Sequence, residues 1–175
     1  TEWLYDKLTS LRHTNGRPLV KIFGKHGQSD SNEVQGSILN FELLGSNGKV
    51  LSYKTFEREA ADAGFHVRTG IECNPGAAYN YIGIQESEVE SLAGLTEGCE
   101  DELEYIQVPR PRDNALYASV DMSELSQIPD ETIENARLVN IPLGSVRVSL
   151  GYMSTFEDCL TFAQFLESRC KDRES

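Results

Sequence analysis

The stretch Val34-Gln-Gly-Ser-Ile-Leu-Asn-Phe-Glu-Leu-Leu44 carries the clearest strand pattern in the chain. Apolar side chains at Leu39, Phe41 and Leu43 alternate with polar ones. Side chains point to opposite faces at each step along a strand, so this spacing puts the three apolar residues on one face. We therefore expect a strand with one buried face.

Elements on both sides of this strand follow from the same kind of pattern. Helices are expected over residues 2–13, 53–63 and from 154 onward, and strands over 19–23, 65–68 and 144–150. This order of elements predicts an α+β fold. The expected architecture is a two-layer sandwich in which a small, mostly antiparallel sheet has helices on one face.

Capping residues mark the ends of the expected helices. Ser52 is expected to cap the second helix, which ends at Gly64. Ser154 and Glu157 have the spacing of a capping box at the start of the last helix. The inner face of that helix is expected to carry an apolar stripe of Phe156, Cys159, Leu160, Ala163 and Leu166. His66, in an apolar strand, is interpreted as a packing residue.

Length and composition are typical of a soluble globular protein. The 175 residues are expected to form one domain over residues 1–175, long enough to bury a core. The formal net charge of −12 excludes nonspecific binding to nucleic acid and disfavours an anionic membrane surface, because both are polyanions. No apolar run is long enough to span a membrane, and no signal peptide is visible.

The cysteines and histidines are scattered along the chain. The four cysteines are Cys73, Cys99, Cys159 and Cys170. None of them forms a C-x-x-C pair, which indicates free thiols in a reducing, cytoplasmic compartment. The histidines, at positions 13, 26 and 66, form no i, i+4 pair and lie near no cysteine in the sequence, so no metal site is expected.

Residues 96–135 differ in composition from the rest of the chain. Eleven acidic residues face only Arg110 and Arg112 there, and three of the six prolines fall in this segment. Two interpretations are open. A solvated surface insertion or partly ordered loop is the more ordinary one, and an acidic docking tail is the functional one.

Cys73 is the first residue that could carry chemistry. It follows Arg68-Thr-Gly by a short spacer and precedes Pro75-Gly76, which stop a helix or strand from continuing. A thiol on an irregular loop near an arginine is placed to act as a thiolate, because a cation favours the charged form. The alternative is that Cys73 is a small buried hydrophobe, which is the usual role of a free cysteine.

Arg147 is the second such residue. It lies in the middle of the strand expected over 144–150, on the face opposite Val146 and Val148. An arginine at such a position either pairs with a carboxylate of the protein or presents its planar fork to a carboxylate or phosphate of a ligand.

Several collinear motifs resemble one family. They are Asn15-Gly-Arg-Pro-Leu-Val-Lys-Ile22, Val34-Gln-Gly-Ser-Ile-Leu-Asn-Phe41, His66-Val-Arg-Thr-Gly70, Cys73-Asn-Pro-Gly-Ala77 and Gly144-Ser-Val-Arg-Val-Ser-Leu-Gly-Tyr-Met-Ser-Thr155. Together they look like the C-terminal small domain of the class V aminotransferase-like cysteine desulfurases, the small domain of fold-type I pyridoxal phosphate enzymes. Within that superfamily the chain is most similar to the molybdenum cofactor sulfurases.

The resemblance implies a reaction and a role for three residues. Such enzymes use pyridoxal phosphate to take sulfur from L-cysteine as an enzyme persulfide, release alanine, and pass the sulfur to the molybdenum cofactor. By position, Cys73 matches the sulfur-accepting nucleophile and Arg147 the arginine that binds the substrate carboxylate. Arg68 matches the loop arginine beside the nucleophile. The resemblance also allows a homodimer.

The resemblance further implies that the large domain, which holds the cofactor through a lysine Schiff base, is absent here. The lysines at 7, 21, 25, 49, 54 and 171 lie in no matching motif. We therefore expect no pyridoxal phosphate on this chain alone, and we interpret the chain as a fragment or an incomplete gene product. Two other hypotheses stay open: a stand-alone binding module without turnover, and a persulfide relay that needs no pyridoxal phosphate.

Overall fold

The computed structural model describes residues 1–26, 36–71, 105–111 and 136–174. The contacts within the chain divide it into two compact units. Unit 1 consists of Thr1–Thr69 and Ser145–Ser175, and unit 2 of Gly70–Gly144. The expectation of one domain over residues 1–175 stays a prediction.

Unit 1 is built on a sheet of four strands in the order β1-β2-β6-β3. The strands are β1 (Val20–Phe23), β2 (Ile38–Leu43), β6 (Ser145–Ser149) and β3 (Arg68–Gly70). β2 runs antiparallel to both of its neighbours, and Phe41 lies opposite Ile22 on one side and Val146 on the other. The strand with the clearest pattern in the sequence is therefore an interior strand of the predicted sheet.

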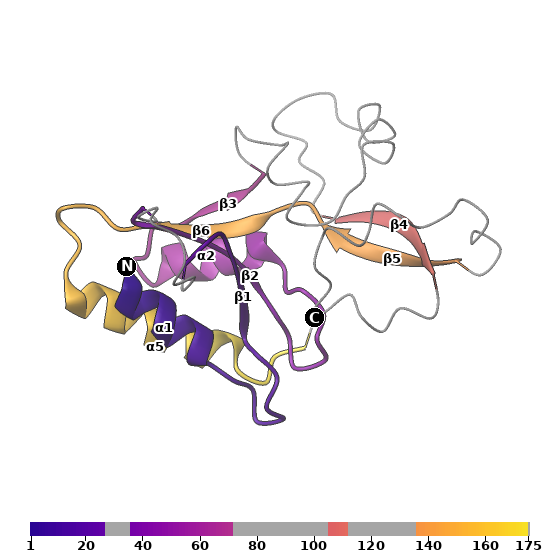
Figure 1. Ribbon diagram of the computed structural model, residues 1–175, viewed down its shortest axis with the longest axis horizontal. Coiled ribbons are helices and arrows are strands. Elements are labelled where there is room, and N and C mark those ends of the chain that lie inside the picture. Colours follow the sequence, from indigo (N-terminus) through magenta and orange to yellow (C-terminus); the bar gives the residue numbers. More distant parts are fainter. Residues whose placement is uncertain (27–35, 72–104, 112–135, 175) are drawn as a thin grey trace. The chain divides into compact units, whose positions relative to one another are not determined.

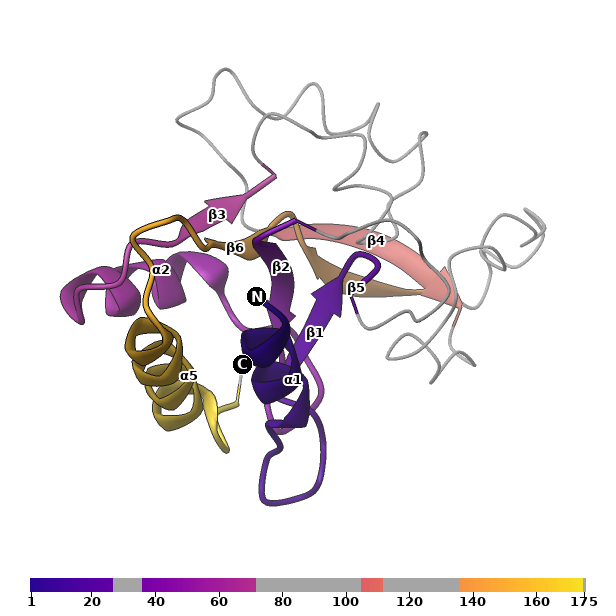
Figure 2. The ribbon, with the colours of Figure 1, turned by 60° about the vertical axis from the view of Figure 1, so that its left-hand side comes forward.

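Three helices form the second layer of unit 1. They are α1 (Glu2–Ser10), α2 (Tyr53–Asp62) and α5 (Phe156–Cys170). They lie together on one side of the strands (Figures 1 and 2). The predicted α+β sandwich with helices on one face is confirmed. In the part of the chain that the structure describes, no helix is long and apolar enough to cross a membrane.

One hydrophobic core lies between the two layers. The sheet contributes the alternate residues of β2, Val20 of β1 and Val146 of β6, and each helix contributes its inner face. Large buried side chains of this core include Leu39, Phe41, Leu43, Leu19, Leu4, Leu8, Phe56 and Leu166. Because alternate residues of a strand point to opposite faces, the second face of the sheet carries the other set. We call it the helix-free face, because none of the three described helices lies on it.

The second helix begins and ends as predicted. The hydroxyl of Ser52 caps α2. Gly64 follows its end with φ of +84°, a left-handed conformation that glycine adopts readily. The strand predicted to start at Phe65 begins instead at Arg68, because the Phe65 N–H bonds to the Ala60 carbonyl and closes the helix end.

The start of the last helix corrects a prediction. Thr155, not Ser154, is the N-cap of α5, and it shares a capping box with Asp158 rather than with Glu157. The Asp158 carboxylate accepts from the Thr155 N–H at 2.8 Å, which lowers the pKa of Asp158. The Ser154 hydroxyl is used elsewhere, as the acceptor for the Gly151 N–H at 3.0 Å. Ser154 and Thr155 are neighbours and both could cap a helix. Because the Ser154 hydroxyl bonds within the preceding turn, Thr155 caps α5.

This start also changes the inner face of α5. Phe156 was predicted to be buried but is 61% exposed. The side chains that are buried instead are Phe162, Ala163, Leu166 and Cys170, so only Ala163 and Leu166 of the predicted stripe are fully buried. The packing role predicted for His66 is also wrong, because its side chain is exposed.

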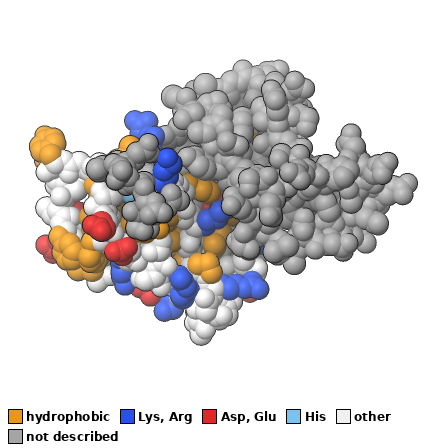
Figure 3. Space-filling view, viewed as in Figure 1, with side chains coloured by type: hydrophobic (Ala, Val, Ile, Leu, Met, Phe, Trp, Pro, Cys, Tyr) orange, Lys and Arg blue, Asp and Glu red, His pale blue; other side chains and the backbone are white. Residues whose placement is uncertain are grey.

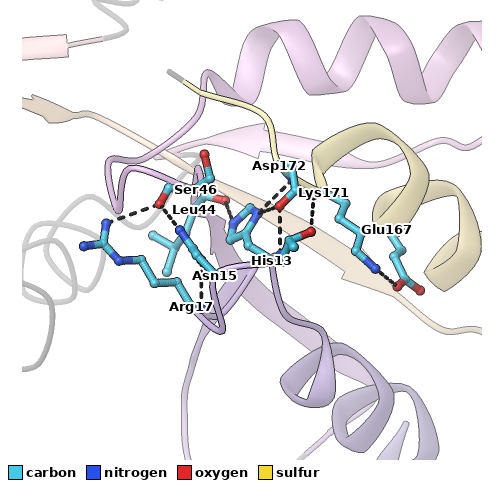
Figure 4. Close-up of polar contacts among 9 residues, drawn as sticks. His13, Asn15, Arg17, Leu44, Ser46, Glu167, Lys171 and Asp172 are labelled. Atoms are coloured by element: carbon cyan, nitrogen blue, oxygen red, sulfur yellow. Dashed lines mark hydrogen bonds and ion pairs between the residues drawn. The ribbon is translucent and has the colours of Figure 1, made fainter.

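A polar cluster around His13 joins the α1–β1 turn to the end of α5 (Figure 4). The Asp172 N–H donates to Nδ1 of the buried His13 ring at 3.0 Å, so Nε2 carries the proton and donates to the Leu44 carbonyl at 2.9 Å. Both the hydroxyl and the N–H of Thr14 donate hydrogen bonds to the Asp172 carboxylate. These two bonds lower the pKa of Asp172, and the hydroxyl has the larger effect. His13 is therefore a structural residue that connects three segments.

Unit 2 contributes a pair of strands to the described residues. β4 (Tyr105–Pro111) and β5 (Ala136–Pro142) are antiparallel, with Tyr105 opposite Pro142 and Pro111 opposite Ala136. β4 lies inside the acidic segment 96–135, where the composition did not indicate a strand. The remaining residues of that segment lie outside the described part of the chain.

The buried face of β2 gives the first testable prediction. Leu39→Ala should lower the free energy of unfolding by about 2–5 kcal/mol, because it removes a fully buried side chain and leaves a cavity. The neighbouring Ile38 is 46% exposed on the opposite face, so Ile38→Ala should cost about 0.5 kcal/mol or less. Urea unfolding of both variants checks this. Equal losses would contradict the assignment of the two faces.

Candidate functional site

The helix-free face of the sheet carries the polar residues of the strands. The strand register places Lys21 opposite Glu42, and Phe23 and Arg147 on either side of Asn40. These residues lie one position away from the residues of the same strands that point into the core between the layers, so they share the helix-free face. This face is the candidate site of unit 1.

Arg147 lies in the middle of β6 on this face, as predicted. Its side chain is partly buried, whereas its neighbour Val146 is in the core on the opposite face. Arg147 is directly across the strand pair from Asn40, whose side-chain oxygen accepts from the Ser145 hydroxyl at 2.6 Å. The arginine is therefore set in a polar surface on a regular strand.

Arg68 reaches the same face from the next strand. β3 is hydrogen-bonded to β6 in the sheet. The Thr69 hydroxyl donates to Glu57 of α2 at 2.8 Å, which fixes Thr69 on the helix side. Val67 also packs against the core. The alternation of side chains then puts Arg68, which is exposed, on the helix-free face with Arg147.

A buried carboxylate, Glu42, is the residue of this face that sequence reasoning did not single out. Glu42 is only 6% exposed, and one of its oxygens lies 3.7 Å from the Lys21 ammonium. Burial raises the pKa of Glu42, and this effect outweighs the lowering by Lys21. The sequence did contain a signal for this buried carboxylate. Glu42 is an acid in the middle of an apolar strand, two positions from Asn40, and Lys21 lies in the preceding strand.

The electrostatics of this face differ from those of the whole chain. Among its strand residues, the positive charges of Lys21, Arg68 and Arg147 outnumber the single negative charge of Glu42. The chain as a whole has a net charge of −12. The described strands therefore place two arginines on one face, and the planar fork of an arginine suits a carboxylate or phosphate.

Cys73, the predicted nucleophile, lies outside the described residues. The structure describes the chain that leads to it as far as Ile71, through β3. Two other cysteines are described. Cys170 is buried, and burial raises the pKa of its thiol to about 12. Cys159 is partly buried at the start of α5.

The strand residues of the helix-free face that the structure describes do not offer a lysine matching a Schiff-base motif for pyridoxal phosphate. Lys21 is the lysine that the described strands place on this face, and its ammonium lies near Glu42 and 5.2 Å from the centre of the Phe23 ring. It is not presented for a Schiff base. Two of the three described histidines make side-chain hydrogen bonds elsewhere: His13 in the cluster above, and His26 with the Ile38 carbonyl at 3.0 Å.

The described fold is an α+β unit that carries Arg68 and Arg147 on one face of its sheet. Over 94% of its length the chain is similar to proteins named molybdenum cofactor sulfurase. It is 32% identical over 165 residues to the protein of Bos taurus and 30% identical over 165 residues to that of Homo sapiens. Over 95% of its length it is 30% identical to the Drosophila melanogaster protein. The chain spans only 15% of the bovine and human proteins, so the similarity concerns one stretch of much longer polypeptides.

Two further comparisons give no match. No family profile matches the chain. No solved structure matches it either. The similarity to the sulfurases therefore rests on sequence, and it supports the resemblance to molybdenum cofactor sulfurases. The placement as the C-terminal small domain of a desulfurase stays a prediction.

The buried carboxylate gives a prediction about pH. The pKa of Glu42 is raised above its ordinary 4.5 in the folded protein, so the folded state holds this proton to higher pH than the unfolded state does. Its contribution to the free energy of unfolding should therefore be full at low pH and fall as pH rises through the raised pKa. Glu42→Gln lacks this contribution, so its stability relative to the wild type should increase as pH rises above the ordinary pKa of 4.5.

Urea unfolding at several pH values tests this expectation. The control is Ile38→Ala, which changes an exposed residue of the same strand without adding or removing a titratable group and should give a constant difference from the wild type. A constant difference for Glu42→Gln as well would contradict the assigned pKa direction.

Proposed function

We propose that this chain is the sulfur-accepting part of a molybdenum cofactor sulfurase. In the complete enzyme it takes sulfur from L-cysteine as a persulfide on Cys73 and passes it to the molybdenum cofactor. The similarity to proteins with that name over 94% of the chain carries the proposal. The placement of Arg68 and Arg147 on one sheet face supports it, because both belong to motifs that suggested the family.

The proposed step at Cys73 balances without an added oxidant. The Cys73 thiolate attacks the sulfur of L-cysteine, a sulfur–sulfur bond forms and the carbon–sulfur bond of the substrate breaks. The electron pair of that bond stays with carbon, which takes up a proton to give alanine. Pyridoxal phosphate, when bound, supplies the electron sink that makes this cleavage accessible. The cofactor is held by polypeptide outside this chain, in line with the absence of a matching lysine motif.

The two arginines have separate parts in this proposal. Arg147 binds the substrate carboxylate with two parallel hydrogen bonds, and the regular backbone of β6 fixes the direction of its side chain. Arg68 lies at the start of β3, a few residues before Cys73. Its charge favours the thiolate form of that cysteine.

Two alternatives use the same residues differently. In a persulfide relay, Cys73 receives sulfur from a separate desulfurase and no pyridoxal phosphate takes part. In a binding module, the basic face holds an anion and Cys73 reacts no faster than an ordinary thiol. The relay is favoured over the binding module by the match of Cys73 to the family motif.

A chimera gives a direct test of Cys73. In it, the 165 matched residues of the bovine protein are replaced by this chain. After incubation with L-cysteine, the peptide that contains Cys73 should gain about 32 Da, the mass of one sulfur atom. Cys73→Ala should abolish alanine release, while Cys159→Ala, as a matched control, should keep it. Alanine release that survives Cys73→Ala would refute the proposed nucleophile.

The same chimera tests Arg147. Arg147→Lys keeps the charge but loses the planar fork, so kcat/KM for L-cysteine should fall by about tenfold or more, mainly through KM. Arg169→Lys is the control, because Arg169 is an exposed residue over the Phe165 ring of α5 and does not lie on the sheet. Equal effects of the two substitutions would speak against carboxylate binding by Arg147.

A further inference from the structure

Unit 1 has an exposed apolar surface where the β6–α5 loop meets the starts of α1 and β2. Within the described part of unit 1, the large exposed apolar side chains are Trp3, Ile38, Tyr152, Met153 and Phe156. Four of the five come from the β6–α5 loop and the starts of α1 and α5, whereas Ile38 lies at the start of β2 on the helix-free face. Figure 3 shows hydrophobic side chains gathered at this end of the unit, with acidic side chains beside them. Clustered exposure of this kind marks a contact surface.

A groove runs through this surface. Its apolar lining includes Trp3, Leu150, Phe156 and Cys159, and Ser37 is among its polar lining residues. The rings of Trp3 and Phe156 meet edge to face with their centres 4.6 Å apart. The Leu150 N–H donates to the Ser37 carbonyl at 2.9 Å. The groove is therefore held between three segments of the chain rather than formed by one loop.

The charged residues beside the groove indicate which kind of segment it binds. Glu2 and Glu157 are exposed and stand next in the chain to the lining residues Trp3 and Phe156. A second copy of the chain would bring the same acidic rim and a net charge of −12 against this surface. Like charges oppose such an association. The surface instead suits an apolar segment that carries lysine or arginine beside its apolar side chains.

We infer that this groove docks a segment of the sulfurase polypeptide that lies outside the stretch this chain matches. The inference rests on the proposed function, since a complete sulfurase supplies the segment. The chain spans only 15% of the bovine and human proteins, so most of the polypeptide lies beyond the match. The loop Gly151–Thr155, one of the motifs that indicated the family, borders the groove and has no part in the proposed sulfur chemistry.

Cys159 lines the groove, so the reactivity of its thiol reports whether the groove is covered. Alkylation by iodoacetamide, followed at the level of single peptides by mass spectrometry, gives the rate at this thiol. In the chimera the rate at Cys159 should be about tenfold or more lower than in the isolated chain, because the docked segment covers the thiol. Cys170 is an internal control: burial raises the pKa of its thiol to about 12, so it should stay unmodified in both proteins.

Two matched substitutions test the charge and the apolar contact. Glu157→Lys and Phe156→Lys should each return the rate at Cys159 in the chimera to within about threefold of that in the isolated chain. Glu167→Lys makes the same charge change at the other end of α5 and should leave Cys159 protected. Equal rates at Cys159 in the chimera and the isolated chain would overturn the inference.

If the chimera does not fold, a second measurement on the isolated chain tests whether the groove binds such a segment. The chain contains a single tryptophan, so incorporation of 5-fluorotryptophan gives one fluorine resonance at Trp3. Overlapping peptides from the bovine protein outside the match are then added to the labelled chain. At least one basic, apolar peptide should shift this resonance, and Phe156→Lys should weaken its binding by about tenfold, or 1.4 kcal/mol. If no peptide shifts it, the inference fails.

The remaining outcomes separate this inference from the proposed function and from a rival occupant. Alanine release that depends on Cys73, with Cys159 unprotected, would refute the docking site and leave the sulfurase assignment standing. Protection of Cys159 without alanine release would refute the proposed sulfur chemistry and support the docking site. A Trp3 resonance that moves with the concentration of the isolated chain, together with dimer on gel filtration, would assign the groove to a second copy and overturn the inference.

Discussion

The alternation of side chains along β2 is the constraint on which the rest of unit 1 depends. Leu39, Phe41 and Leu43 must leave water together, and they can do so only if all three point into one layer. That layer is filled by the inner faces of three helices. A slip of one residue in the pairing with β6 would put Arg147 into the core and Val146 outside, at a large cost in free energy. The hydrophobic core therefore determines which face receives the arginines.

This constraint explains how much of the fold could be predicted from the sequence. The pattern of β2 and β6, the cap at Ser52 and the glycine at position 64 each act over a few residues, so each was predicted correctly. The start of α5 was predicted one residue too early. Ser154 and Thr155 are equally good caps by chemistry, and only the turn at Gly151 decides between them. Phe156, the first residue of α5, is exposed and lines the groove.

The candidate site was predicted in part for a related reason. Arg68 and Arg147 stand in recognisable motifs, and strand alternation alone puts Arg147 on the polar face. That Arg68 shares this face follows from the hydrogen bond between Thr69 and Glu57, which links residues 12 apart and depends on how α2 packs. The burial of Glu42 and the role of His13 as the acceptor for the Asp172 N–H also depend on distant segments, since His13 and Asp172 are 159 positions apart. No local pattern contains that information.

The two surfaces of unit 1 have opposite chemistry, and this division is consistent with a unit that works as part of a larger protein. The helix-free face is basic and presents arginines from regular strands, which are rigid supports for a small anion. The groove at the other surface is apolar with an acidic rim, and its residues come from a loop and from helix starts, which can adapt to a polypeptide. A free-standing anion-binding module needs the first surface but gains nothing from the second, because exposed Tyr152 and Met153 favour aggregation when nothing covers them. The combination therefore favours the sulfurase fragment over the stand-alone binding module.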